Sequence, residues 1–237
     1  MMSWAIFEVM GTVAFALSGT MVGLARRMDV FGIAVLACVT AVGGGIIRDI
    51  LAGIAPPLAM RDPLGIFLAL ATAALVTLIY TRLRVSRESR HRMEFLYDVS
   101  DTIGLAAFTV TGAMMGAYAL PESSYVFPVT LGTVTAVGGG IVRDLLAMRV
   151  PTVLRMDVYA SASVVGALVY CVVAGTSKDL ASWASFAVVI VIRMLALRYG
   201  WQLYHPRSKR KKNGSAERSI EQHHEREACR EADDADV

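Results

Sequence analysis

The sequence predicts an all-α integral membrane protein with seven transmembrane helices, arranged as two inverted three-helix repeats and a seventh helix. Three observations support this prediction. Hydrophobic residues make up 55% of the 237 residues, apolar runs of membrane-spanning length recur along the chain, and one glycine-rich motif occurs twice. Such a composition lies far from that of soluble domains, and ~20 apolar residues in a helix span the ~30 Å hydrocarbon core of a bilayer.

Seven apolar runs have about this length. They cover residues 4–25, 30–54, 64–81, 96–119, 126–148, 157–176 and 181–200. The segments between the runs carry charged residues and turn formers, such as the Pro56-Pro57 pair. The first run has no basic segment before it and is longer than the core of a signal peptide, so we expect it to remain as a helix.

The glycine-rich motif is the most unusual feature of the chain. It reads TAVGGGIIRDILA over residues 40–52 and TAVGGGIVRDLLA over residues 135–147, 95 positions later. Each copy lies inside an apolar run, so we expect the glycines and the charged pair at membrane depth. Each Gly gives up about 1 kcal/mol of helix propensity relative to Ala, and a charge near the bilayer centre costs at least ~2.5 kcal/mol. A motif this costly, present twice, indicates a function.

The repetition extends beyond this motif. Glu8 in the first run matches Asp101 in the fourth at an offset of 93. The same offset matches Gly11, Phe15, Gly19 and Gly23 with Gly104, Phe108, Gly112 and Gly116. Because each repeat has three spans, the second copy must enter the membrane from the opposite side. We therefore divide the chain into a first repeat with its basic loop (1–95), an inverted second repeat (96–178), a seventh helix (179–206) and a tail (207–237).

The distribution of Lys and Arg predicts the orientation. The odd-numbered connections and the tail contain most of the basic residues, whereas the opposite side contains only Arg61 and Lys178. Because basic loops stay in the cytoplasm, we expect a multi-pass protein of the cell inner (plasma) membrane, with its N-terminus outside and its C-terminus cytoplasmic. The basic loops and the cluster at 207–212 would contact anionic lipid headgroups. The rest of the tail is expected to be solvated.

The glycine triplets allow two interpretations. They could serve tight helix packing, or they could break or kink a helix so that freed backbone carbonyls face a solute. We favour the second interpretation, which makes the triplets pore and hinge residues. These are Gly43, Gly44, Gly45, Gly138, Gly139 and Gly140.

The charged residues near the triplets are predicted to form a gating network. Adjacent Arg and Asp side chains point about 100° apart on a helix, so we expect each arginine to be held by a carboxylate or by freed carbonyls of another segment. The acidic residues of the first and fourth runs are either hydrated helix-end charges or residues of a pore mouth. The predicted network comprises Glu8, Arg48, Asp49, Asp101, Arg143 and Asp144.

Other classes of function find little support in the sequence. No Ser-His, Cys-His or metal-ligand arrangement occurs among the apolar runs, so we expect no enzyme, no metal site and no cofactor. Basic residues collect in short connections and in the tail rather than on a nucleic-acid-binding face, so we expect no nucleic-acid partner.

The doubled motif, the plan of three, three and one spans, and the basic cytoplasmic segments resemble the prokaryotic members of the trimeric intracellular cation channel family. The resemblance covers about residues 4–200. The same sequence family has also been labelled as glycine transporters. Membership implies a homotrimer with a separate pore in each protomer, lying between the two repeats, with the second and fifth helices bent at the glycines. It also implies conduction of potassium and sodium.

Two functions remain open from the sequence. The first is a passive channel for monovalent cations, in which carbonyls of the triplets and nearby carboxylates favour cations. The second is an alternating-access carrier for a small zwitterion such as glycine, for which inverted repeats with broken helices are equally suited. A buried arginine is awkward in a cation pathway, so Arg48 and Arg143 are the main argument against the channel. We favour the channel because of the family resemblance.

Overall fold

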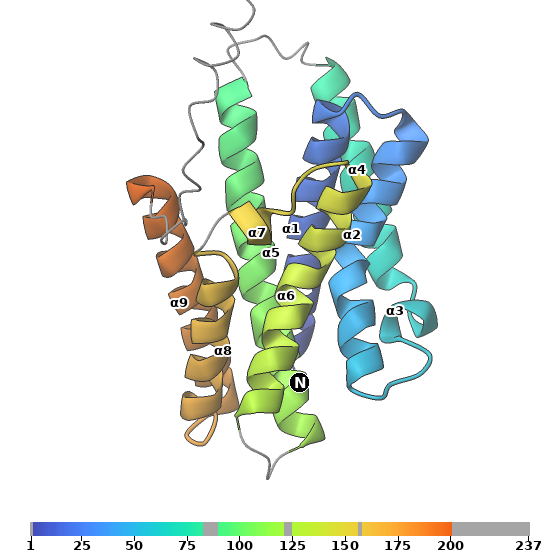
Figure 1. Ribbon diagram of the computed structural model, residues 1–237. Helices are drawn as coiled ribbons and strands as arrows, with labels where there is room; N and C mark the ends of the chain where they lie inside the picture. The colour runs from blue at the N-terminus through green and yellow to red at the C-terminus, as the bar shows by residue number, and fades with distance from the viewer. Residues whose placement is uncertain (1, 83–89, 121–124, 156–157, 201–237) are drawn as a thin grey trace, which may run out of the picture. The chain divides into compact units, whose positions relative to one another are not determined.

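The computed structural model describes residues 2–82, 90–120, 125–155 and 158–200. All of the regular structure in these residues is helical (Figure 1). The long helices are α1 (Met2–Ala25), α2 (Val30–Leu51), α4 (Leu64–Arg82), α5 (Arg90–Ala119), α6 (Val126–Leu146) and α9 (Lys178–Tyr199). Three shorter helices are α3 (Leu58–Arg61), α7 (Thr152–Arg155) and α8 (Ala160–Val173). The predicted tail, 207–237, lies outside the described residues.

Six helices in the described ranges are long and apolar enough to cross a membrane. They correspond to the predicted runs one to five and seven. The predicted run at 157–176 appears as α8, an apolar helix of only 14 residues. At 1.5 Å per residue, α8 is about 21 Å long, which is short of the ~30 Å hydrocarbon core. The chain is therefore an all-helical membrane protein, but the described residues do not show seven full-length spans.

The two motif helices end earlier than their apolar runs. Helix α2 ends at Leu51 rather than 54, because Gly53 has a φ of 74° and leaves the helical region. The N–H of Ile54 then donates to the carbonyl of Asp49 at 2.8 Å, and that of Gly53 donates to Ile50 at 3.1 Å. This is the Schellman arrangement that ends many helices, and it satisfies carbonyls of the last turn.

Helix α6 ends in the same way at Leu146. Met148 takes the left-handed conformation with a φ of 52°, and Arg149 N–H donates to the carbonyl of Asp144 at 2.9 Å. Each Arg-Asp pair therefore lies in the last turn of its helix. The charged pairs thus lie at the helix ends rather than within a continuing helix, and their depth in the membrane stays a prediction.

The helices that match by sequence run in opposite directions. Helix α1 ascends in Figure 1 and α5 descends, whereas α2 descends and α6 ascends. Helix α5 packs against α1, α6, α8 and α9, and α2 packs against α1, α4 and α6. The four helices α1, α2, α5 and α6 thus form the centre of the described bundle, while most side chains of α4 are exposed.

The centre of the bundle contains a reciprocal aromatic contact. The rings of Phe15 in α1 and Phe108 in α5 meet edge to face with centroids 5.2 Å apart. The Phe15 ring also covers Gly104, and the Phe108 ring covers Gly11, so any larger residue at either glycine would collide with a ring. The glycines matched in α1 and α5 therefore serve close helix packing here.

Candidate functional site

The two glycine triplets lie against each other where α2 crosses α6. A Cβ atom placed on Gly44 would be 2.2 Å from the carbonyl oxygen of Thr135, and one on Gly139 would be 2.2 Å from that of Thr40. Both distances are far below van der Waals contact, so only glycine permits this crossing. The helical structure continues without interruption through both triplets, so the described helices have no break that frees carbonyls, and bending at the triplets stays a prediction. The packing interpretation accounts for these contacts.

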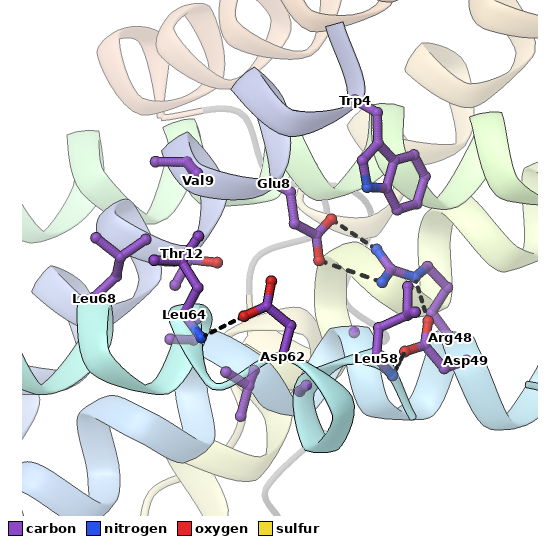
Figure 2. Close-up of a pocket in the computed structure, with 15 residues that line it drawn as sticks. Trp4, Glu8, Val9, Thr12, Arg48, Asp49, Leu58, Asp62, Leu64 and Leu68 are labelled. Carbon is purple, nitrogen blue, oxygen red and sulfur yellow. Dashed lines mark hydrogen bonds and ion pairs between the residues drawn. The ribbon is translucent and has the colours of Figure 1, made fainter. Parts of the chain in front are cut away.

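The first charged cluster surrounds Arg48 in the last turn of α2 (Figure 2). Its Nη1 donates to Glu8 Oε2 at 2.9 Å and its Nη2 donates to Glu8 Oε1 at 3.3 Å. Its Nε donates to Asp49 Oδ1 at 2.9 Å, and the guanidinium lies 4.8 Å from the centre of the Trp4 ring. The arginine is 1% exposed, so nearly all of its charge is compensated by these neighbours rather than by solvent.

The second charged cluster surrounds Arg143 in the last turn of α6. Its Nη1 donates to Asp101 Oδ1 of α5 and its Nε donates to Asp144 Oδ1 at 3.0 Å. The guanidinium lies 5.0 Å from the centre of the Tyr97 ring. Tyr97 and Trp4 match at the offset of 93 that also relates Asp101 to Glu8. Both arginines therefore have the same set of partners, namely an acid and an aromatic ring from the first helix of their own repeat and the aspartate that follows in sequence.

The prediction that adjacent Arg and Asp do not pair is wrong in both copies. Helical geometry separates the Cβ directions, but a long arginine side chain in a last turn can fold back, so that its Nε reaches the next residue. The prediction that each arginine is held by a carboxylate from another segment is confirmed for Glu8 and Asp101.

Contacts between the two repeats use hydroxyl groups. Arg48 Nη1 donates to Thr111 Oγ1 of α5 at 3.3 Å, and Arg143 Nη1 donates to Ser18 Oγ of α1 at 2.9 Å. Ser18 and Thr111 again match at an offset of 93. Neither arginine contacts the aspartate of the other repeat's motif among the described contacts. The structure instead places a neutral hydroxyl at that point, because the aspartates are occupied within their own repeats.

Each motif aspartate also accepts a hydrogen bond from the backbone of the segment that follows its helix. Asp49 Oδ2 accepts the N–H of Leu58 at 2.7 Å, and Asp144 Oδ2 accepts the N–H of Thr152 at 2.8 Å. Thr152 matches Pro57 at the offset of 95, and proline has no N–H, so the first repeat uses the next residue. Asp144 accepts in addition from Thr152 Oγ1 at 2.9 Å and from Arg149 Nη2 at 2.7 Å.

The two clusters differ in how far their acidic side chains are accessible to solvent. A cavity of about 220 Å³ lies beside the first cluster, and Glu8, whose side chain is 31% exposed, faces it. The cavity is walled by α1, α2, α3 and α4, and Asp62 directs its carboxylate into it (Figure 2). At the second cluster, Asp101 and Asp144 are buried. Tyr159, which matches the cavity residue Leu64 at the offset of 95, is buried beside Gly140 there.

Sequence reasoning missed several members of these clusters. They are Trp4, Ser18, Asp62, Tyr97, Thr111, Arg149 and Tyr159. The offsets of 93 and 95 already paired the first-repeat and second-repeat members and could have found most of them. Within the described ranges, no group of three or more His, Cys, Asp and Glu residues could hold a metal ion.

Comparison with known proteins agrees with this architecture. A family model described as "Glycine transporter" matches residues 5–81 and 98–175, which are the two repeats. The UPF0126 inner membrane protein YadS of Escherichia coli K12 is 35% identical over 210 residues, covering 87% of this chain and 97% of the relative.

Two similar solved structures are named as channels. One is titled "Crystal structure of a prokaryotic TRIC channel in 0.5 M KCl" and has a TM-score of 0.78 at 26% identity, covering 85% of this chain and 99% of that one. The other is the TRIC trimeric intracellular cation channel orthologue from Rhodobacter sphaeroides, with a TM-score of 0.76 at 30% identity, covering 85% of this chain and 100% of that one. The resemblance noted from the doubled motif is thus confirmed, and the chain belongs to the UPF0126 family, whose sequence model is described as "Glycine transporter".

Proposed function

We propose that this protein is a channel for monovalent cations, potassium and sodium, with one pore in each protomer. The observation that carries the proposal is the acid-rich cluster at one end of the glycine crossing, matched by a charge-balanced cluster at the other end, in a fold shared with solved cation channels. The pore would run between the two repeats, bounded by α1, α2, α5 and α6. The inferred path passes from the cavity at Glu8 through the glycine crossing to the cluster at Asp101.

The charges in the first cluster favour cations. Three carboxylates, those of Glu8, Asp49 and Asp62, line the cavity together with one arginine, Arg48. The arginine donates to both Glu8 and Asp49, so its charge is offset where a permeating cation would pass. This answers the main objection to a channel, that a buried arginine repels cations. The excess of carboxylates would concentrate cations at the mouth, as rings of acidic residues do in cation channels.

The triplets are the proposed constriction and hinge. Gly44 and Gly139 hold α2 and α6 in contact at the crossing. Without side chains, the glycines oppose bending less than other residues would. We propose that both helices bend at Gly43–Gly45 and Gly138–Gly140 on opening. The networks around Arg48 and Arg143 would hold the two ends closed.

The proposed setting is the cell inner membrane. Helix α8 would be the sixth of seven spans, with the first repeat and its loop at 1–95, the inverted second repeat at 96–178, the seventh helix at 179–206 and the tail at 207–237. The basic loops would lie in the cytoplasm against anionic lipids, with the N-terminus outside. A homotrimer with separate pores is proposed from the trimeric channel orthologue that shares the fold.

A second function, a carrier for a small zwitterion such as glycine, is favoured by one specific observation. Glu8 of the first cluster faces the cavity and is 31% exposed, whereas the matching Asp101 is 1% exposed, so the two ends differ in access as in an alternating-access carrier. The description of the matching family model points the same way.

One experiment separates the two functions. Purified protein in liposomes would be tested for unitary potassium currents and, in parallel, for saturable uptake and counterflow of labelled glycine. We expect unitary currents without glycine counterflow. Saturable counterflow in the absence of current would overturn the channel and establish the carrier.

A further inference from the structure

Three buried polar atoms of the second cluster have no hydrogen-bond partner among the described residues. They are Asp101 Oδ2, Arg143 Nη2 and Tyr159 Oη. The three side chains are each at most 1% exposed, so bulk solvent does not reach them. Leaving a buried polar group unsatisfied is costly, and native proteins rarely do so. Three such atoms on neighbouring residues call for a common partner.

The cause is the length of one side chain. In the first cluster, Glu8 uses both carboxylate oxygens to hold both terminal nitrogens of Arg48. In the second, the matching acid is Asp101, which is one methylene shorter. Its Oδ1 holds Arg143 Nη1, which leaves the second oxygen of the acid and the second terminal nitrogen of the arginine unpaired.

Gly140 leaves room beside these atoms. A Cβ atom placed on Gly140 would be 3.3 Å from Tyr159 Oη and 3.6 Å from Arg143 Nη2, so both atoms border the space that the missing side chain leaves. Asp101 Oδ2 belongs to the carboxylate already bonded to the same guanidinium. Two of the three atoms therefore border one small space at the third glycine of the second triplet, and the third belongs to the carboxylate bound to the same guanidinium.

The chemistry of the three atoms selects the ligand. Arg143 Nη2 can only donate, Asp101 Oδ2 accepts, and the tyrosine hydroxyl does either. The charges of the second cluster are already balanced, because ion pairs join its two aspartates to Arg143 and Arg149, so no ion is needed there. A small neutral molecule that both donates and accepts satisfies all three.

The geometry points to a single bound water that bridges Asp101, Arg143 and Tyr159 beside Gly140. Buried waters typically make about three hydrogen bonds to groups that would otherwise be unsatisfied, which matches the number available here. Tyr159 is thereby a positioning residue of the second cluster. In the first repeat its place is taken by Leu64, which has no polar group, and the longer Glu8 makes such a water unnecessary.

The direct test is a structure of the purified protein at about 2 Å or better, with potassium replaced by rubidium. We expect a peak within hydrogen-bonding distance, ~2.6–3.2 Å, of all three atoms, without anomalous signal. A rubidium signal at that position would show that a cation, not a water, occupies the site, and would overturn the proposal. An empty position, at a resolution where other buried waters are seen, would overturn the proposal.

Two variants give an independent thermal readout. Gly140→Ala places a methyl group into the proposed space, and Asp101→Glu supplies the carboxylate length found at Glu8; each should displace the water. Tyr159→Phe should then lower the melting temperature in the wild-type background but have little effect in either variant. Tyr170→Phe, at another buried tyrosine, is the matched control and should have the same effect in all backgrounds. An equal effect of Tyr159→Phe in all three backgrounds would contradict the bridging water whether or not the protein conducts.

Discussion

Gly44 of α2 lies directly on the backbone carbonyl of Thr135 in α6, and Gly139 of α6 lies in the same way on the carbonyl of Thr40 in α2. The contact is reciprocal because the two helices are copies of one segment that run in opposite directions. Approach this close brings the Cα–H groups of the glycines to the carbonyls, a weak interaction that is common where helices pack through glycine. The crossing thus couples the two repeats through backbone atoms rather than side chains.

This contact predicts that neighbouring glycines respond oppositely to the same change. Gly44→Ala should destabilise the protein by about 1–3 kcal/mol, because its methyl group would collide with backbone that cannot move aside. Gly43→Ala is the matched control, because the nearest atom to its Cβ is 3.9 Å away. The gain of up to ~1 kcal/mol in helix propensity should make that variant neutral or slightly more stable. Thermal unfolding of both variants measures the difference, and equal melting temperatures would contradict the crossing.

A second prediction concerns which charges are coupled. Arg143→Ala should cost ~3–5 kcal/mol, because it leaves the buried carboxylate of Asp101 without its cation. The part of the loss that comes from the matching acid should be smaller for Arg48→Ala, because Glu8 is 31% exposed and can be hydrated from the cavity. Neutralising the partner as well, with Asp101→Asn or Glu8→Gln, should recover part of each loss.

Double-mutant cycles read by thermal or chemical unfolding would measure these couplings. We expect non-additivity of ~0.5–3 kcal/mol within each pair, whereas the crossed combination of Arg48 with Asp101 should be additive within about 0.5 kcal/mol. Coupling in the crossed pair that equals coupling in the direct pairs would refute the separation into two clusters.

The extent of sequence prediction differed between the helices and the charged clusters. Five of the six long helices lie close to the predicted runs, because the length of an apolar stretch is a local property. The sixth, α5, begins at Arg90, before the predicted run at 96–119. The helix ends after Arg48 and Arg143 were both placed too late. Gly53 does signal the end of α2, but the left-handed residue that ends α6 is Met148, which gives no turn signal in the sequence.

The glycine triplets show why other predictions failed. Helix propensity predicts a break at three consecutive glycines, but the close contact with another helix stabilises the helical conformation there, so tertiary packing overrides propensity. The acids Glu8 and Asp101 were placed in the network correctly, because the repeat offset identifies them. The pairing of Arg48 with Asp49 was missed, because the direction of a Cβ atom does not determine where the guanidinium of a flexible arginine lies.

A third prediction compares the two motif aspartates. Asp144 accepts hydrogen bonds from Arg143, Arg149 and two groups of Thr152, whereas Asp49 accepts from Arg48 and Leu58. Asp144→Asn should therefore lower the melting temperature more than Asp49→Asn, because hydrogen bonds to a charged acceptor contribute about 1.5–3 kcal/mol each. The difference should shrink in the Arg149→Gln background. A larger loss for Asp49→Asn would contradict this ranking.

A fourth prediction concerns assembly. If each protomer carries its own pore, trimers assembled from wild-type and blocked subunits should conduct in proportion to the number of wild-type subunits. Gly43→Leu is a suitable blocked subunit, because no atom lies nearer than 3.9 Å to its Cβ position, so a larger side chain can enter the proposed constriction without a backbone collision. Single-channel recordings from defined mixtures would show three evenly spaced current levels. Complete loss of current with one blocked subunit would indicate a shared pore instead.

The last prediction concerns Asp62, which lines the cavity and is exposed. Its Oδ1 accepts the N–H of Leu64 at 3.0 Å, at the beginning of α4. Asparagine caps a helix about as well as aspartate does, so Asp62→Asn should keep the local structure while removing one negative charge from the mouth of the proposed pore. If that charge concentrates cations, potassium conductance should fall at low ionic strength, where the screening length is ~30 Å at 0.01 M. The loss should vanish near 1 M salt, where the screening length is ~3 Å.

Arg61→Gln is the matched control, because Arg61 lies next in the chain but binds the carbonyl of Ala55 and does not line the cavity. It should leave conductance unchanged or slightly raised. A loss for Asp62→Asn that persists at high salt, or an equal loss for Arg61→Gln, would show that the cavity charge does not act on permeating cations.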